Sequence, residues 1–408
     1  MLYRRRLETS NLDSARQSPI EALRSERGGP SLRGKGDEAA ETREGPVGLR
    51  SAEQVSASEP ARRDRLGKVA ASPNSTFQAD GGILARPRRN RKSPSIRQLV
   101  EENILSPADL VMPFFVIEGE NKQEAIKSLP GVARLSLDLI LTEAEKLHKQ
   151  GIPSIALFPV IDTKLKDEQG TAALHEDGLI VRALRTLKRE IPSLCLITDI
   201  ALDPFTSHGH DGVVDHRGYV MNDPTVEILC KMACLFGAAG ADIVAPSDMM
   251  DGRIGAIRRQ LDLAGLQEVG ILSYTAKYAS SLYGPFREAV GSTLKFGDKK
   301  TYQLNPANSR EAVRQAILDA EQGADILLVK PALYYLDIIT KIKEKVHLPL
   351  CAYHVSGEYA MVMAAHANGW LNATKVFYEA LLSIKRAGAD FIFSYAVPKI
   401  LELYTKSF

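Results

Sequence analysis

The sequence has little of several features that would assign a function at once. Its 408 residues include four cysteines and one tryptophan, and aromatic residues make up 6% of the chain. No two cysteines form a C-x-x-C pair, so we expect buried structural thiols in a reducing compartment. No stretch approaches 18 consecutive apolar residues, and we therefore expect no membrane span and no membrane partner.

Charge is distributed unevenly along the chain. Residues 1–92 hold 19 Lys and Arg against 12 Asp and Glu, whereas residues 93–408 hold 33 against 38. The first part is rich in Arg, Ser, Gly and Ala and has almost no aromatic residues, so it cannot bury enough apolar surface to offset its ordering entropy. We expect 1–92 to be a disordered basic extension. Its basic run at 86–92 lacks interleaved aromatic residues, and we expect no nucleic-acid partner.

The composition of the extension also indicates in which cellular compartment the protein is expected. Its twelve acidic residues argue against a transit peptide, and no apolar segment follows the opening MLYRRR, as a secretory signal requires. We therefore expect a cytoplasmic protein.

From about residue 93, short apolar runs alternate with amphipathic stretches. Eight runs are apolar on both alternating faces, which is typical of strands buried on both sides of a parallel sheet. They lie at 110–116, 154–160, 194–200, 242–247, 270–276, 325–331, 348–354 and 390–396. Helical periodicity occurs between them at 135–151, 179–191, 225–240, 309–323, 335–346 and 372–388.

This alternation predicts an α/β protein with a (β/α)8 TIM barrel over residues 93–408. An open doubly wound sheet is the runner-up, but no G-x-G-x-x-G follows any of the runs. The stretch PSIRQLVEENILSP at 94–107 precedes the first run and predicts a helix. We interpret it as part of an N-terminal arm, at about 93–109, that contacts another subunit.

Polar side chains stand at the ends of six successive predicted strands. In this fold the catalytic groups lie where strands end and the following loops begin. The residues at these positions are Asp199, Ser247, Lys277, Lys330, Ser356 and Tyr395. One such residue is commonly just solvated, but six together predict a functional rim.

Lys277 and Lys330 end neighbouring predicted strands in apolar surroundings. A free lysine has a pKa of about 10.4 and attacks carbonyls only as the neutral amine. Burial and a nearby second cation both lower that pKa. Two such amines suggest two carbonyl substrates held as Schiff bases. A single Schiff-base lysine, as in a class I aldolase, and an ion-pair role for one lysine are the alternatives.

Seven stretches resemble the porphobilinogen synthase, or 5-aminolevulinate dehydratase, family. They are DIALDPFTSHGHDG (199–212), VAPSDMMDGRIGAIR (244–258), SYTAKYASSLYGPFREA (273–289), YQLNPANSREA (302–312), LLVKPALYYLDI (327–338), AYHVSGEY (352–359) and IKRAGADFIFSY (384–395). The resemblance implies condensation of two 5-aminolevulinates to porphobilinogen with loss of two waters. It also implies a TIM barrel and a homo-octamer.

The resemblance further assigns roles to individual residues. It places the first substrate on Lys330, with Ser356 and Tyr395 holding its carboxylate, and the second substrate on Lys277. The positions that face the second carboxylate are Arg287, Lys299 and Gln303; many members have Arg where Lys299 stands, and lysine lacks the bidentate fork. Ser247 and Tyr283 complete the expected substrate site, and residues 284–303 resemble a mobile lid.

The stretch DIALDPFTSHGHDG bears on the metal. Zinc-dependent members read D-x-C-x-C…H-G-H-C here, whereas the three cysteine positions of this chain are Ala201, Asp203 and Asp211. Carboxylates favour hard ions such as magnesium over zinc. We therefore expect the aspartate-rich, zinc-independent type, with magnesium near Asp203 and Asp211 as the candidate ion. Alternatively, Asp199, Asp203 and Asp211 serve as proton acceptors or hold the substrate ammonium, while the histidines of the loop shape it.

The resemblance also concerns a second, allosteric metal position. Many members of this type bind an allosteric magnesium through a Glu for which this chain has Gln315, and a neutral amide is a weak ligand for a hard dication.

A catalytically inactive barrel with a binding or assembly role is the alternative to an enzyme. The plastid stroma is the alternative compartment, because the loop resembles plant forms.

Overall fold

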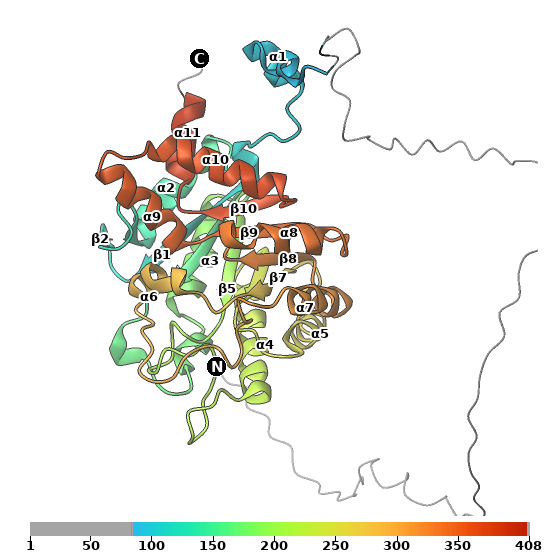
Figure 1. Ribbon diagram of the computed structural model, residues 1–408. Coiled ribbons are helices and arrows are strands. Elements are labelled where there is room, and N and C mark those ends of the chain that lie inside the picture. The colour runs from blue at the N-terminus through green and yellow to red at the C-terminus, as the bar shows by residue number, and fades with distance from the viewer. Residues whose placement is uncertain (1–82, 84, 406–408) are drawn as a thin grey trace, which may run out of the picture. The chain divides into compact units, whose positions relative to one another are not determined.

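The computed structural model describes residues 83 and 85–405, so most of the predicted extension lies outside the described residues. Within them, eight parallel strands form the barrel (Figure 1). The strands are β1 (Leu110–Ile117), β4 (Ser154–Pro159), β5 (Cys195–Ile200), β6 (Ile243–Pro246), β7 (Gly270–Lys277), β8 (Ile326–Lys330), β9 (Leu350–His354) and β10 (Phe391–Ser394). Strand β10 pairs with β1 through Leu110↔Ile392 and Val111↔Phe393. This closure confirms the predicted TIM barrel and shows that the open-sheet alternative was wrong.

Helices on the outside follow the strands and cover the barrel (Figure 1). They are α2 (Leu137–Lys149), α3 (Leu179–Glu190), α4 (Asn222–Ala238), α5 (Arg253–Leu263), α7 (Arg310–Glu321), α8 (Leu336–Lys343), α10 (Ala373–Arg386) and α11 (Val397–Thr405). The six helices expected from periodicity are all present. Every residue of β1, β4 and β9 is buried, which explains why these strands are apolar on both faces.

Three insertions in the barrel were not expected from the sequence pattern. Strands β2 (Gln123–Ala125) and β3 (Ala133–Ser136) form an antiparallel hairpin, and β3 also pairs with β1. Helix α6 (Gly284–Val290) follows β7, and helix α9 (Ser356–Ala367) follows β9. All three lie after the carboxyl ends of strands, where loops build the site of this fold.

The predicted arm helix is much shorter than expected. Helix α1 (Pro94–Leu99) ends at Leu99 instead of Pro107, and the chain is not helical again until the 3-10 turn η2 (Pro107–Asp109). Ser93 caps the start of α1 by accepting a hydrogen bond from the Ile96 amide at 3.3 Å. The helix buries no residue, and without a packed face little stabilises further turns. Another 3-10 turn, η1 (Pro87–Arg91), precedes it and is also exposed.

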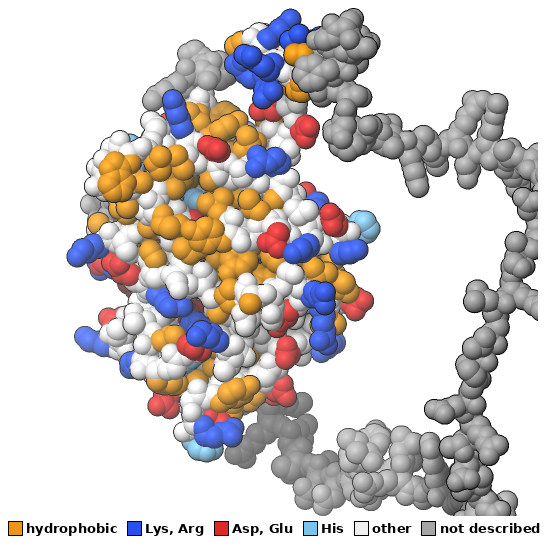
Figure 2. Space-filling model, viewed as in Figure 1, with side chains coloured by type: hydrophobic (Ala, Val, Ile, Leu, Met, Phe, Trp, Pro, Cys, Tyr) orange, Lys and Arg blue, Asp and Glu red, His pale blue; other side chains and the backbone are white. Residues whose placement is uncertain are grey.

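The surface carries an apolar region over α8, α9 and α10 (Figure 2). Met361, Trp370 and Leu371 are among its exposed side chains, with Trp370 at 76% exposure. Among residues 83 and 85–405, no helix is both long enough and apolar enough to cross a membrane.

A substitution of Gly357, near the start of α9, tests how closely this helix packs against the turn at Leu282. A Cβ there would lie 2.5 Å from the Leu282 carbonyl oxygen and 2.7 Å from its Cα. We expect Gly357→Ala to lower the free energy of unfolding by about 1–3 kcal/mol, because the 3-10 turn η5 (Ser281–Tyr283) must shift. Gly255→Ala in α5 is the matched control, since its Cβ would meet only ordinary contacts. Urea denaturation measures both, and equal values would contradict the close approach.

Candidate active site

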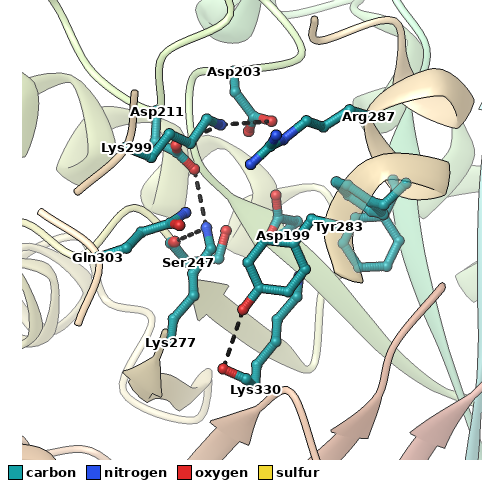
Figure 3. A pocket seen from close by; sticks show the side chains of 12 residues that line it. Asp199, Asp203, Asp211, Ser247, Lys277, Tyr283, Arg287, Lys299, Gln303 and Lys330 are labelled. Carbon is teal, nitrogen blue, oxygen red and sulfur yellow. Dashed lines mark hydrogen bonds and ion pairs between the residues drawn. The ribbon is translucent and has the colours of Figure 1, made fainter. Parts of the chain in front are cut away.

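The carboxyl ends of the strands surround a cavity that gathers most of the predicted site residues (Figure 3). Its lining consists of Phe158, Asp199, Asp203, Asp211, Ser247, Lys277, Tyr283, Phe286, Arg287, Lys299, Gln303 and Lys330. Ten of the twelve predicted catalytic and substrate-binding residues are in this set. Ser356 and Tyr395 are outside it, whereas Phe158 and Phe286 were not predicted.

The two lysines are neighbours because their strands are in register. Lys277 ends β7 and pairs directly with Lys330 at the end of β8. Both residues are 5% exposed, and both side chains point into the cavity (Figure 3). The expected proximity of two buried amines is therefore present in the structure.

Lys330 lies in an aromatic enclosure. Its Nζ is 4.7–5.3 Å from the ring centroids of Tyr274, Tyr283, Phe286 and Tyr353. In the described part of the chain, no carboxylate forms a salt bridge with it. Burial lowers the pKa of Lys330 to about 7, and the positive charge of Lys277 acts in the same direction. A large fraction of this amine is therefore neutral near pH 7, as attack on a carbonyl requires.

Lys277 has different surroundings. Its Nζ lies 3.0 Å from Asp211 Oδ1 and also donates to the Ser247 carbonyl oxygen. The pair of lysines is therefore asymmetric: one amine is ion-paired, and the other is surrounded by rings.

Two aspartates of the loop after β5 form ion pairs with Lys299. The Lys299 Nζ lies 2.7 Å from Asp211 Oδ2 and 3.5 Å from Asp203 Oδ2. Burial alone would raise the pKa of the Asp211 carboxyl, but Lys277 and Lys299 outweigh burial and hold that pKa below its usual range. Burial likewise opposes the charge of Lys299, yet the two aspartates raise its pKa.

Asp199 behaves differently from Asp211. It is buried at the end of β5, and its Oδ1 has no hydrogen-bond partner within the described residues. Burial raises the pKa of Asp199 to about 7, and the nearby Asp203 acts in the same direction. This carboxyl can therefore exchange a proton near neutral pH.

The donor groups of the loop do not fit a metal ion in this arrangement. Asp203 and Asp211 already face ammonium groups. His208 Nε2 lies 3.1 Å from the Glu168 carbonyl oxygen, and His210 Nε2 lies 3.2 Å from that of Phe296. Across the described ranges, no group of three or more His, Cys, Asp or Glu side chains is placed to hold a metal.

The side chain of Gln315 in α7 also has a hydrogen-bond partner within the protein. Its Nε2 donates to Asp319 Oδ1 at 2.8 Å, and Asp319 Oδ2 accepts from the Ser273 hydroxyl at 2.6 Å. This network links α7 to β7. A neutral amide that donates its hydrogen offers no anionic oxygen to a magnesium ion, so the residues here do not fit one.

Segment 284–303 contributes Arg287, Lys299 and Gln303 to the lining of the cavity. The Lys295 amide donates to the His208 carbonyl oxygen at 3.2 Å, and the Phe296 ring packs over both histidines of the loop, with centroids 5.1–6.0 Å apart. The Tyr283 hydroxyl, just before α6, donates to the Lys330 carbonyl oxygen at 3.1 Å (Figure 3).

Ser356 and Tyr395 lie buried beside the cavity. The Ser356 hydroxyl accepts from the Phe286 amide at 3.1 Å and donates to the Leu282 carbonyl oxygen at 3.2 Å. The Tyr395 hydroxyl lies 3.0 Å from that of Tyr353. Both hydroxyls therefore adjoin the wall of the site that carries α6 and the rings around Lys330.

Sequence reasoning missed the aromatic and hydroxyl partners of the site. Phe158, Phe286 and Tyr302 each adjoin a strand end or a residue that was identified. Tyr302 donates to Asp211 Oδ2 at 2.9 Å. Its position beside Gln303 was the available signal, but an aromatic residue at such a place is more commonly packed in a core.

Comparison with known proteins agrees with this geometry. A family model described as delta-aminolevulinic acid dehydratase matches residues 84–403. The enzyme of that name from Chlamydia pneumoniae is 53% identical over 326 residues, covering 80% of this chain and 98% of the relative. The Physcomitrium patens enzyme, named chloroplastic, is 53% identical over 312 residues and covers 76% of this chain and 72% of the relative.

A solved structure shows the same likeness. The crystal structure of the Toxoplasma gondii delta-aminolevulinic acid dehydratase (porphobilinogen synthase), in complex with its reaction product porphobilinogen, is 47% identical. It superposes with a TM-score of 0.78 and covers 81% of this chain and 97% of that one. With two buried lysines in register at the rim of a closed barrel, and with these matches over four fifths of its length, the chain belongs to the delta-aminolevulinic acid dehydratase family.

Proposed function

We propose that Lys330 and Lys277 carry the dehydratase reaction of this family, the condensation of two 5-aminolevulinates to porphobilinogen with loss of two waters. The observation that carries this proposal is the register pair Lys277↔Lys330, which brings two amines with different surroundings together in one cavity. Each amine attacks the ketone carbon of one substrate, and water leaves as the imine forms. Both substrates are then held covalently, next to each other.

The aspartates handle protons and charge in this scheme. Asp199 accepts and returns a proton during the condensation, which its pKa of about 7 supports. Asp211 stays ionised and stabilises positive charge on Lys277, 3.0 Å away. Asp203 contributes negative charge beside Lys299 and attracts the substrate ammonium group.

The substrate carboxylates have separate binding groups. Arg287, Lys299 and Gln303 bind the carboxylate of the second substrate from the lid, and all three line the cavity. Ser356 and Tyr395 bind that of the first substrate from beneath α6. Tyr283 and Ser247 position Lys330 and Lys277 through the contacts described above.

We further propose that the loop belongs to the aspartate-rich type and works without zinc. It offers Ala201, Asp203 and Asp211 where zinc-dependent members have thiolates, and both carboxylates are engaged by lysines. Magnesium stays a prediction, and any magnesium site would use donors other than these aspartates and Gln315.

The assembly and the compartment also stay predictions. The exposed apolar residues over α9 and those of α1 and its flank, such as Leu99 at 84% exposure, support contacts between subunits. The homo-octamer stays a prediction, which sedimentation of the full chain would measure. The chloroplastic name of the Physcomitrium patens relative supports the plastid stroma, the alternative to the expected cytoplasm. A fluorescent fusion of the full chain distinguishes the two compartments.

Reductive trapping tests the two Schiff bases. We expect borohydride with 5-aminolevulinate to modify Lys330 and Lys277, as read by peptide mass spectrometry. Lys277→Ala should retain the Lys330 adduct while porphobilinogen formation falls by at least about 1,000-fold. Lys188→Ala is the control, because Lys188 is a partly buried, ion-paired lysine outside the cavity. Modification of a single lysine would instead favour a class I aldolase.

The pH dependence of trapping tests the surroundings of Lys330. A pKa lowered to about 7 means that the reactive neutral amine forms as pH rises through that value. The initial rate of cyanoborohydride trapping at Lys330 should therefore rise between about pH 6 and pH 8 and then level off. Lys277→Met removes a neighbouring positive charge and should move this midpoint upward. A rate that still climbs above about pH 9 would show an ordinary amine.

Metal removal tests the loop. We expect that zinc added after treatment with EDTA will not increase porphobilinogen formation, because the loop has no thiolate ligands. Magnesium is added in a parallel sample, and a gain from magnesium alone would show that the enzyme responds to a hard divalent ion. Activity that needs zinc would refute the aspartate-rich assignment.

A further inference from the structure

Two basic side chains from distant parts of the chain hold the carboxyl end of the lid helix α6. Arg134 of β3 donates from Nε to the Ala289 carbonyl oxygen and from Nη2 to that of Glu288, both at 2.7 Å. Lys166, in the loop after β4, donates to the Gly291 carbonyl oxygen at 2.8 Å. Neither basic residue lines the cavity.

Helix α6 needs such support. It has seven residues, and isolated helices of that length are unstable in water. Its last carbonyl groups lack helical partners and form the negative end of the helix dipole, which cations stabilise. At its start, the Ser356 hydroxyl accepts from the Phe286 amide. The helix is therefore fixed at both ends by residues from outside the lid.

The guanidinium of Arg134 also contacts the hairpin, through a different nitrogen. Glu124 stands directly opposite Arg134 in the β2–β3 register, and its Oε2 accepts from Arg134 Nη1 at 3.2 Å. One edge of the planar group faces this carboxylate, and two nitrogens face the lid. Lysine has no such fork and cannot make all three contacts. Strand β2 and α6 lie on the same side of the barrel (Figure 1).

We propose that Arg134 is a positioning residue for the dehydratase reaction, which acts by holding α6 so that Phe286 and Arg287 face the two lysines. Phe286 forms part of the enclosure of Lys330, with its ring centroid 4.9 Å from the Nζ. Arg287 enters the cavity from the same helix. The inference rests on the proposed role of Arg287 in binding a substrate carboxylate.

The test compares Arg134→Ala and Arg134→Lys with Glu124→Ala in the full chain. Hydrogen exchange of amides 286–292 is measured without substrate, and KM and kcat are measured with 5-aminolevulinate. We expect Arg134→Ala to accelerate the exchange and to raise KM, each by about ten-fold, because two charged hydrogen bonds are lost, with kcat changed less than about three-fold. Arg134→Lys should fall between this variant and the wild type.

Glu124→Ala is the matched control, because it breaks the same cross-strand pair but leaves both contacts to α6. We expect its lid exchange and KM to stay within about two-fold of the wild type. Equal effects in Glu124→Ala and Arg134→Ala would show that hairpin stability is responsible, and unchanged exchange or unchanged KM in Arg134→Ala would overturn the proposal. Because exchange is read without substrate, failure of the Schiff-base scheme would leave that result unaffected.

Discussion

The structure depends on the burial of two lysine amines side by side at the end of a closed sheet. Strands β7 and β8 are in register there, so Lys277 and Lys330 cannot move apart without disturbing the barrel. Burial of two like charges is costly, and the protein reduces this cost differently for each amine. Lys277 is paired with Asp211. Lys330 has no such partner in the described chain, and its lowered pKa lets it shed the charge.

The acidic loop balances the remaining charge of the cavity. Asp211 contacts Lys277, Lys299 and Tyr302 at once, so a single carboxylate joins strand β7, the lid and its own loop. Asp199 lies in the same cavity, but no ammonium group of residues 85–405 lies within salt-bridge distance of it, and burial raises its pKa toward neutrality. The surroundings therefore shift the pKa values of these two aspartates in opposite directions. Asp211 is suited to carry a fixed negative charge, and Asp199 is suited to transfer a proton.

Segment 284–303 is held at the site by contacts from several distant segments. Arg134 holds α6 from the β2–β3 hairpin, Ser356 holds it from α9, and the histidines of the acidic loop pack on Phe296. Together these contacts place Arg287 at the cavity. Most residues that line the cavity are buried, so electrostatic interactions there are stronger than in water.

The sequence by itself determined the barrel, because strands buried on both faces are apolar throughout and alternate with helices of period 3.6. It also singled out the lysines and Asp199, since an ionisable residue at the end of an apolar strand is conspicuous, whereas Asp203 and Asp211 were identified from the loop and its family resemblance. Only the tertiary structure decided which groups pair: Lys299 binds Asp203 and Asp211, and Gln315 turns inward to Asp319. The contact of Arg134 with α6 spans 155 residues. Such partners leave no local pattern, because their proximity arises when separate loops meet at one rim.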